Sequence, residues 1–212
     1  WMALTKVIGN GLGTLGDGTA NDTKIVFDGN AQDYHIGLDD SSDKLVIGKG
    51  TALGTTTSMT FDANGIINKP LQPASNAYVS SHFTIPINTN HDVVFGTENY
   101  DVNGDYDTSN GQFTAPVDGK YLVSTSLYVF NYLDTDAGYY YLTLFTSNET
   151  VDVLFFTSSF LDSDSSGFNM QCSAVLGMDA GDTAKTIIYQ NGGAAQTQIA
   201  GAHSNFNVTL LC

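Results

Sequence analysis

Four oxygen-bearing side chains alternate along the stretch "DVNGDYD", at a spacing that could wrap a cation. Asp101, Asn103, Asp105 and Asp107 stand at every second position around Gly104. Carboxylate and amide oxygens arranged in this way around a glycine turn are the ligands that calcium loops use. The stretch lacks the distal bidentate glutamate of a helix–loop–helix calcium site. Two interpretations stay open, a Ca2+ site made by these four residues or a solvated, turn-prone loop before a strand.

Two further segments combine aromatic side chains with Asp, Asn or Gln, and this combination suits sugar recognition. Sugar rings offer apolar faces that stack on aromatic rings, and their hydroxyls bond to carboxylates and amides. The segments are "FNYLDTDAGYY" and "YQNGGAAQTQ". The candidate receptor-binding residues in them are Asn131, Tyr132, Asp134, Asp136, Tyr139, Gln190, Asn191, Gln196 and Gln198. For the two tyrosines of the first segment, a contact between subunits is the alternative.

The sequence carries no pattern of a known catalytic site. G-x-S-x-G, H-E-x-x-H, C-x-x-C and a phosphate-cradling glycine motif are all absent, and the four histidines are scattered. Paired carboxylates leave a glycosidase open as an alternative, which release of reducing sugar would reveal. We therefore expect a protein that is not an enzyme and, apart from Ca2+, needs no cofactor.

The charge of the chain excludes several classes of partner. All seven basic residues are lysine, and the formal net charge is −15. Nucleic-acid binding needs a basic surface, so we expect no nucleic-acid partner. The same charge opposes docking on an anionic membrane, and no apolar run reaches membrane-spanning length. The stretch "MALTKVIGNGLGTLG" has no apolar signal-peptide core, which gives no sign of conventional secretion.

The composition predicts an all-β protein. Of the 22 acidic residues only Glu98 and Glu149 are glutamate, and the chain contains 22 glycines. Aspartate and glycine favour turns, whereas glutamate favours helices. Cys172 and Cys212 show no metal-binding spacing, and two separate thiols are favoured over a disulfide bridge.

The first third of the chain consists of short strand-like runs. "YHIGLDDSSDKLVIG" alternates apolar residues on both sides of a turn and predicts a hairpin. Each run offers two or three apolar side chains, and isolated hairpins are marginal in water. Either these runs dock on the rest of the chain or copies from several chains share one core, and the second is favoured. We predict a β-rich stalk or attachment segment over 1–70, a proline-containing linker over 71–76 and a second domain over 77–212.

The second domain contains longer strands rich in aromatic residues. In "GKYLVSTSLYVF" and "GYYYLTLFT" apolar or aromatic residues fall on both faces. A strand exposed on one face should alternate with polar residues instead. One face is therefore expected to meet a sandwich core and the other a neighbouring subunit. The spacing of further short strands fits a sandwich or a jelly roll.

The order of several motifs in this domain resembles the C1q globular-head family, which shares its jelly roll with the tumour necrosis factor superfamily. The matching elements are Phe95, Asn99, Tyr106-Asp107, the G-x-F-x-A-P-x-x-G-x-Y pattern from Gly111 to Tyr121, and the Gly181-Asp182 turn. The closing strand departs from the family, with Asn205-Phe206-Asn207 instead of S-x-F-S-G. The resemblance implies a ten-stranded jelly roll over 77–212, a homotrimer, and loops that bind a partner.

The first segment resembles parts of tail-fibre and other structural proteins of bacteriophages. "DYHIGLDDSSDKLVIG" and "FDANGII" carry this likeness. The two resemblances together imply a homotrimeric virion protein at the tail fibre or its tip. Its N-terminal segment would bind other virion proteins, and its head would bind a host surface glycan or protein. The alternatives are a fibre that decorates the capsid and a non-viral C1q-like adhesin or lectin.

Overall fold

The computed structural model describes residues 15–16, 18–130, 139–157, 167–193, 196–197 and 203–212. The chain divides into two compact units, Trp1–Leu71 and Gln72–Cys212. The linker predicted over 71–76 differs from the structure, because residues 74–76 belong to strand β6 (Ala74–Tyr78) and pair with strands on both sides. Among the described residues no helix is long and apolar enough to cross a membrane.

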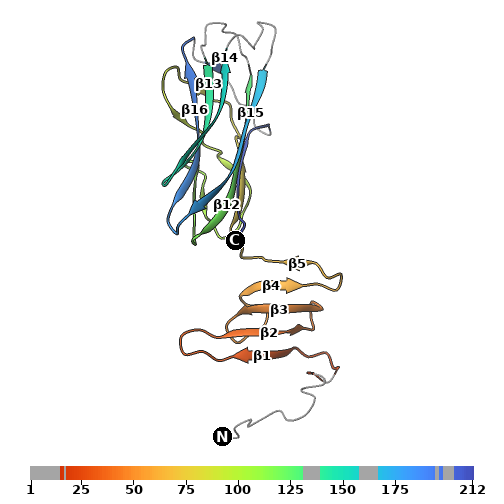
Figure 1. The fold of residues 1–212 in the computed structure, drawn as a ribbon. Coiled ribbons are helices and arrows are strands. Elements are labelled where there is room, and N and C mark those ends of the chain that lie inside the picture. Colours follow the sequence, from red (N-terminus) through yellow and green to blue (C-terminus); the bar gives the residue numbers. More distant parts are fainter. Residues whose placement is uncertain (1–14, 17, 131–138, 158–166, 194–195, 198–202) are drawn as a thin grey trace. The chain divides into compact units, whose positions relative to one another are not determined.

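The N-terminal unit contains one antiparallel sheet in the order β1-β2-β3-β4-β5 (Figure 1). Its strands are β1 (Thr23–Phe27), β2 (Tyr34–Asp39), β3 (Lys44–Lys49), β4 (Thr57–Phe61) and β5 (Ile67–Asn68). The predicted hairpin is confirmed, because β2 pairs with β3 from Tyr34↔Lys49 to Asp39↔Lys44. The connecting turn needs a left-handed residue, which Asp43 supplies at a φ of 52°.

The two faces of this sheet differ in what covers them. On one face His35 and Val46 are almost fully buried, at 1% and 2% exposure. The loop after β3 lies against this face, since His35 Nδ1 is 2.9 Å from the carbonyl oxygen of Gly50. A Cβ at Gly48 would lie 2.6 Å from the carbonyl oxygen of Thr56, so only glycine lets the loop approach so closely. The opposite face carries exposed apolar side chains.

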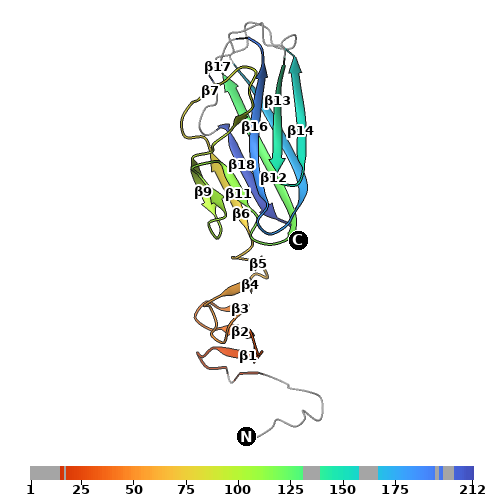
Figure 2. The same cartoon turned by 90° about the vertical axis from the view of Figure 1, so that its left-hand side faces the viewer.

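The C-terminal unit is a sandwich of two antiparallel sheets (Figure 2). One sheet has the order β15-β12-β18-β6-β9, and the other has the order β10-β11-β16-β13-β14, with β8 also pairing to β16. Besides β6 the strands are β7 (Thr84–Ile85), β8 (His91–Asp92), β9 (Thr97–Asp101), β10 (Tyr106–Asp107), β11 (Gln112–Thr114), β12 (Gly119–Phe130), β13 (Tyr139–Thr146), β14 (Thr150–Thr157), β15 (Gly167–Met178), β16 (Thr183–Asn191), β17 (Gln196–Thr197) and β18 (Asn205–Leu210). A short pair, β7 with β17, lies outside both sheets.

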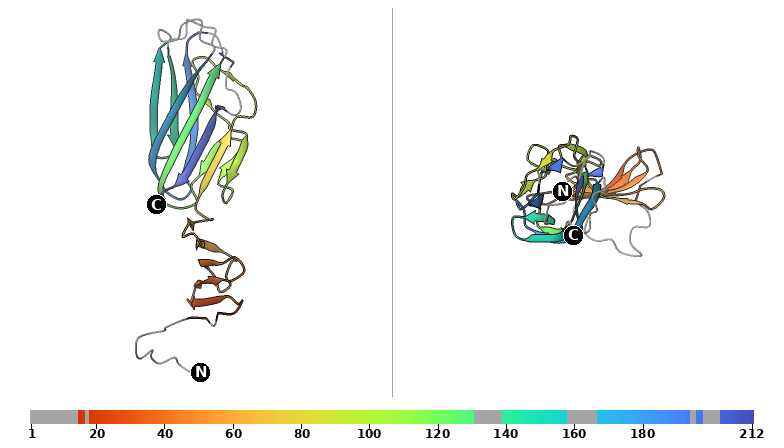
Figure 3. Two further views of the ribbon diagram at one scale, coloured as in Figure 1. Left: turned by 90° about the vertical axis from the view of Figure 1, so that its right-hand side faces the viewer. Right: turned by 90° about the horizontal axis from the view of Figure 1, so that it is seen from above.

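The chain crosses repeatedly between the two layers. Strand β12 lies in the first sheet, β13 and β14 in the second, β15 in the first, β16 in the second and β18 in the first. The long strands β12 and β15 pair along their whole length and run side by side (Figure 3). Two facing antiparallel layers, with a chain that crosses repeatedly between them, form a jelly roll with five strands along each main layer. The predicted fold class, all-β with a C-terminal jelly roll, is confirmed.

The G-x-F-x-A-P-x-x-G-x-Y motif builds one end of the sandwich core. Gly111 has a φ of +74°, and a Cβ there would lie 2.6 Å from the carbonyl oxygen of Val93, so the turn requires glycine. Phe113 and Tyr121 are fully buried, with ring centroids 5.7 Å apart. The Tyr121 hydroxyl donates to the carbonyl oxygen of Val117 at 2.7 Å, which satisfies its polar end. The motif is therefore structural in this chain.

Candidate binding surfaces of the C-terminal unit

The loop predicted to bind Ca2+ is held by its own hydrogen bonds. Asp101, at the end of β9, accepts bonds from the backbone N–H groups of Asp105 and Tyr106 at 3.1 and 2.9 Å. Asn103 occupies the left-handed region at a φ of 78°, as does Gly104 at 77°. Burial raises the pKa of the Asp105 carboxyl above its ordinary value, and the nearby charge of Asp101 raises it further. This loop is thus a turn closed by Asp101.

Asp107, the fourth residue of the predicted site, belongs to the next turn. Its carboxylate accepts bonds from the hydroxyl and the backbone N–H of Ser109 and from the side-chain amide of Asn110. The bond from the Ser109 hydroxyl is the main reason why the pKa of Asp107 lies below its ordinary value. Among the described residues no three His, Cys, Asp or Glu side chains gather in a way that could hold a metal ion. The Ca2+ hypothesis stays a prediction.

The predicted receptor-binding residues fall into two groups. Asn131, Tyr132, Asp134, Asp136 and Gln198 lie outside the described residues. Of the remaining four, Gln196 lies in β17, where its backbone pairs with Ile85.

Gln190 and Asn191 end strand β16, and the structure corrects the first of them. Gln190 is fully buried and donates from its side-chain amide to the carbonyl oxygen of Gly192 at 3.0 Å. A side chain inside the sandwich cannot contact a receptor, so the prediction for Gln190 is wrong in this conformation. Asn191 is half-buried at the same end of the sheet.

Tyr139 belongs to a stack of tyrosine rings on the outward face of the β10-β11-β16-β13-β14 sheet. Its ring lies 6.1 Å from that of Tyr141 on the same strand and 6.0 Å from that of Tyr189 on β16. Tyr141 and Tyr189 are cross-strand partners, 4.8 Å apart and inclined by 14°. Burial is the main reason why the pKa of Tyr141 is raised, with the neighbouring tyrosines adding to it. The stack leaves these rings half-buried against one another.

A second surface lies on the outward face of the other sheet, and it is polar and uncharged. Strand register aligns its residues in two rows across β15, β12, β18 and β6. We call this surface the polar face; its rows are Ser173, Ser124, Asn207 and Asn76, and Gln171, Ser126, Asn205 and Tyr78. None of these eight side chains carries a charge at neutral pH, in a chain with a net charge of −15.

The asparagines of the polar face, together with Asn99 on β9, form a chain of hydrogen bonds. Asn99 donates to Asn76, Asn76 donates to Asn207, and Asn207 donates to Asn205 at 2.9 Å. Side chains fixed in this way keep their remaining donors and acceptors in defined directions. A polar ligand would then bind without the full cost of ordering these side chains.

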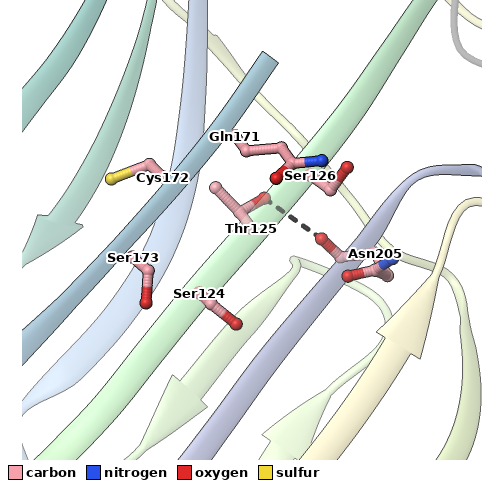
Figure 4. Close-up of a pocket in the computed structure, with 7 residues that line it drawn as sticks. All are labelled: Ser124, Thr125, Ser126, Gln171, Cys172, Ser173 and Asn205. Atoms are coloured by element: carbon pink, nitrogen blue, oxygen red, sulfur yellow. Dashed lines mark hydrogen bonds between the residues drawn. The ribbon is translucent and has the colours of Figure 1, made fainter. Parts of the chain in front are cut away.

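Two grooves follow the polar face. The first, of about 480 Å³, is lined by Ser124, Thr125, Ser126, Gln171, Cys172, Ser173 and Asn205 (Figure 4). The second, of about 430 Å³, is lined by Asn76, Tyr78, Asn99 and Asn205. Asn205 lines both grooves. Thr125 donates to the backbone oxygen of Asn205 at 3.2 Å, which joins β12 to β18 beside the first groove.

The sequence did not single out this surface. The expectation that the outward face of β12 needs an apolar cover fits Leu122, which is 39% exposed and pairs with the exposed Val175. At Ser124 and Ser126 the face is polar instead, because their neighbours on β15 and β18 are also polar. The alternation of serine along the strand was the available signal, but the partner strands could not be read from it. Cys172 is buried, Cys212 is exposed and both are free, which confirms two separate thiols.

No protein-family model matches the sequence, and no curated protein matches it. Among solved structures, the globular domain of a zebrafish complement 1qA protein is 20% identical, with 66% of this chain and 98% of that domain covered and a TM-score of 0.48. Murine APRIL is 8% identical, and the match covers 66% of this chain and 99% of APRIL with a TM-score of 0.48. Eiger TNF from S. frugiperda is 15% identical, and the match covers 66% of this chain and 94% of the Eiger chain with a TM-score of 0.45. The chain is similar to these proteins, while the jelly-roll assignment itself comes from the strand order.

Proposed function

We propose that the chain is a non-enzymatic, trimeric binding protein whose C-terminal unit holds a neutral glycan of a host cell surface on the polar face. The observation that carries this proposal is the pair of neighbouring, uncharged grooves lined by hydroxyl and amide groups, which share Asn205. Three copies in one particle would multiply a weak affinity for each site, provided that all three can reach the surface together.

The chemistry of the polar face supports a polyhydroxyl ligand. Serine hydroxyls and the side-chain amides of Asn205 and Gln171 each offer both donors and acceptors, and the hydroxyls of a sugar need both. Tyr78 adds an aromatic ring at the second groove, on which the apolar face of a sugar can pack. A flat ligand chain could contact both grooves, because they share Asn205.

The charge distribution supports a neutral ligand over an ionic one. A fixed cation would be needed to hold an acidic sugar firmly, and neither row of the polar face contains one. The overall charge of −15 further repels anionic polymers. We therefore expect affinity for neutral glycans that changes little between about 0.05 and 0.5 M salt, because screening acts on charged pairs.

The test is binding of the full chain to immobilised neutral and acidic polysaccharides at two salt concentrations. Changing Ser126→Ala and Gln171→Leu removes polar groups with little change in side-chain size and should weaken neutral-glycan binding about tenfold or more, at roughly 1 kcal/mol or more for each lost bond. Gln112→Leu, on β11 of the other sheet, is the matched control and should bind normally. Unchanged binding by the first variant, or no neutral-glycan binding by the wild type, would refute the proposal.

We further propose that this binding takes place from a bacteriophage virion, at the tail fibre or its tip, with the N-terminal unit bound to other virion proteins. The support is the likeness of "DYHIGLDDSSDKLVIG" and "FDANGII" to phage structural proteins. Gold-labelled antibody on intact particles tests this placement. Label at the tail tip supports it, label over the capsid points to a decorating fibre, and particles without label point to a non-viral adhesin.

A further inference from the structure

We propose that the apolar face of the β1–β5 sheet is the surface through which copies of this chain associate. The inference deepens the proposed trimer by naming the contact that forms it, and it rests on the proposed function only for the number of copies. Its observations all come from the N-terminal unit, so it does not depend on any contact made by the jelly roll.

The strand register places ten apolar side chains on one face of this sheet. Antiparallel partners point to the same face, so pairs such as Ile25↔Ile36, Leu38↔Leu45 and Phe61↔Ile67 align across all five strands. The ten residues, called the apolar face, are Ile25, Phe27, Tyr34, Ile36, Leu38, Leu45, Ile47, Met59, Phe61 and Ile67. Thr23 and Lys49 are the polar residues in the same rows.

Much of this face is open to solvent in the single chain. The six most open side chains are Ile25 at 44%, Phe27 at 58%, Tyr34 at 50%, Leu38 at 48%, Leu45 at 39% and Ile67 at 54%. At roughly 150–250 Å² for a large side chain, they expose on the order of 500 Å² of apolar area. Soluble monomers rarely expose more in one contiguous patch, and such patches are usually functional.

This area matches what a stable interface between proteins contributes. A standard interface buries about 800 Å² on each partner, of which roughly 56–65% is apolar. The apolar share is therefore about 500 Å², close to what the six side chains expose. The apolar face also draws residues from all five strands of the sheet, whose order can be followed in Figure 1. The match favours a folded protein partner over a short peptide.

The charge of the chain and the covered opposite face of the sheet favour a second copy of this chain as that partner. Two chains of charge −15 repel one another, so they associate most easily through a surface without carboxylates. The apolar face has none, and the ionisable groups in its strand rows are Tyr34 and Lys49. The opposite face of the sheet is already covered by the loop that carries Gly50 and Thr56, so the chain covers one face itself and leaves the other for its copies.

The first experiment is hydroxyl-radical footprinting of the wild-type full chain, together with its mass in solution. Tyr34 and Tyr100 are almost equally exposed in the single chain, at 50% and 51%, which makes Tyr100 on β9 the matched control. We expect a mass of three times 22.6 kDa and clearly slower oxidation of Tyr34 than of Tyr100. Equal oxidation, or a monomeric mass, overturns the proposal. Protection of Tyr34 in a monomer would also overturn it, because the cover would then come from the same chain.

The second experiment compares variants of two equally exposed apolar surfaces. Changing Ile25→Asp with Phe27→Asp should reduce the mass to 22.6 kDa, because carboxylates cannot be buried between copies. Val175→Asp, at a side chain 56% exposed on the jelly roll, should leave the mass unchanged. An oligomer that survives the first change, or dissociates only with the second, overturns the proposal. Amide hydrogen exchange over residues 34–49 shows whether the first variant keeps its sheet. The footprinting experiment uses the wild type alone, so its result does not depend on how the variant folds.

The two proposals can fail separately. A wild-type trimer that binds no neutral glycan overturns the polar face as the binding site and leaves the association surface standing. A wild-type monomer that still binds a neutral glycan overturns the association surface and keeps the polar face as the binding site.

Discussion

Gly111→Ala should destabilise the jelly roll much more than Gly104→Ala, although the two glycines have nearly the same backbone conformation. Their φ angles are +74° and +77°, so alanine carries a similar conformational cost at both sites. That cost is about 1–2 kcal/mol for a residue with a Cβ in the left-handed region. The pair of variants therefore separates conformation from crowding.

The difference between the two sites is the space around the added methyl group. At Gly104 nothing lies within 4 Å of a Cβ, whereas at Gly111 the carbonyl oxygen of Val93 lies at 2.6 Å and Cα of Val94 at 3.0 Å. Both atoms are backbone and can move only with their strand, and overpacking of this kind costs about 1–3 kcal/mol. We expect a loss of about 1–2 kcal/mol for Gly104→Ala and about 2–5 kcal/mol for Gly111→Ala.

Denaturant unfolding followed by near-ultraviolet circular dichroism measures both values, since most of the tyrosines belong to the jelly roll. At constant m-value the shift in midpoint gives the difference in the free energy of unfolding. Equal losses for the two variants would refute the argument that close approach of the Val93 backbone fixes glycine in the motif. A larger loss at Gly104 would place the main constraint in the "DVNGDYD" loop instead.

Three further outcomes can be measured on the same protein. Phe206→Ala should lower the free energy of unfolding by about 3–5 kcal/mol in the same denaturant assay, because a fully buried ring leaves a cavity. Hydrogen bonds, first from the Asp179 backbone and then from Ser147, lower the pKa of Asp182, so it stabilises the fold above the ordinary carboxyl pKa and loses this effect as pH falls through its folded value. The free energy of unfolding of Asp182→Asn should accordingly fall less than that of the wild type as the pH is lowered. Denaturant unfolding of both proteins at several pH values measures this difference. Burial raises the pKa of the Cys172 thiol, so a thiol reagent should label one cysteine per native chain, the exposed Cys212, and labelling of both would contradict the buried position.

The predicted binding residues show how far local patterns reach. Tyr139, Tyr141 and Tyr189 share one outward face because side chains alternate along a strand, and this periodicity is visible in the sequence. The same alternation turns Gln190 into the core, where the prediction had it facing a receptor. A segment that looks like a loop by composition can thus be the end of a strand, and one residue of difference moves a side chain to the other face.

The sequence alone determined the local features of the protein, because they depend on neighbours in the chain. The all-β class, the hairpin of the first unit and the turn at Gly111 follow from glycine and aspartate at turns and from alternation along strands. The two surfaces proposed for function were decided by tertiary structure. Asn76 and Asn207 bond across 131 residues, and the apolar face joins five strands whose register depends on long-range pairing. Alternation tells which residues of one strand share a face, but only pairing between strands tells which residues of different strands meet.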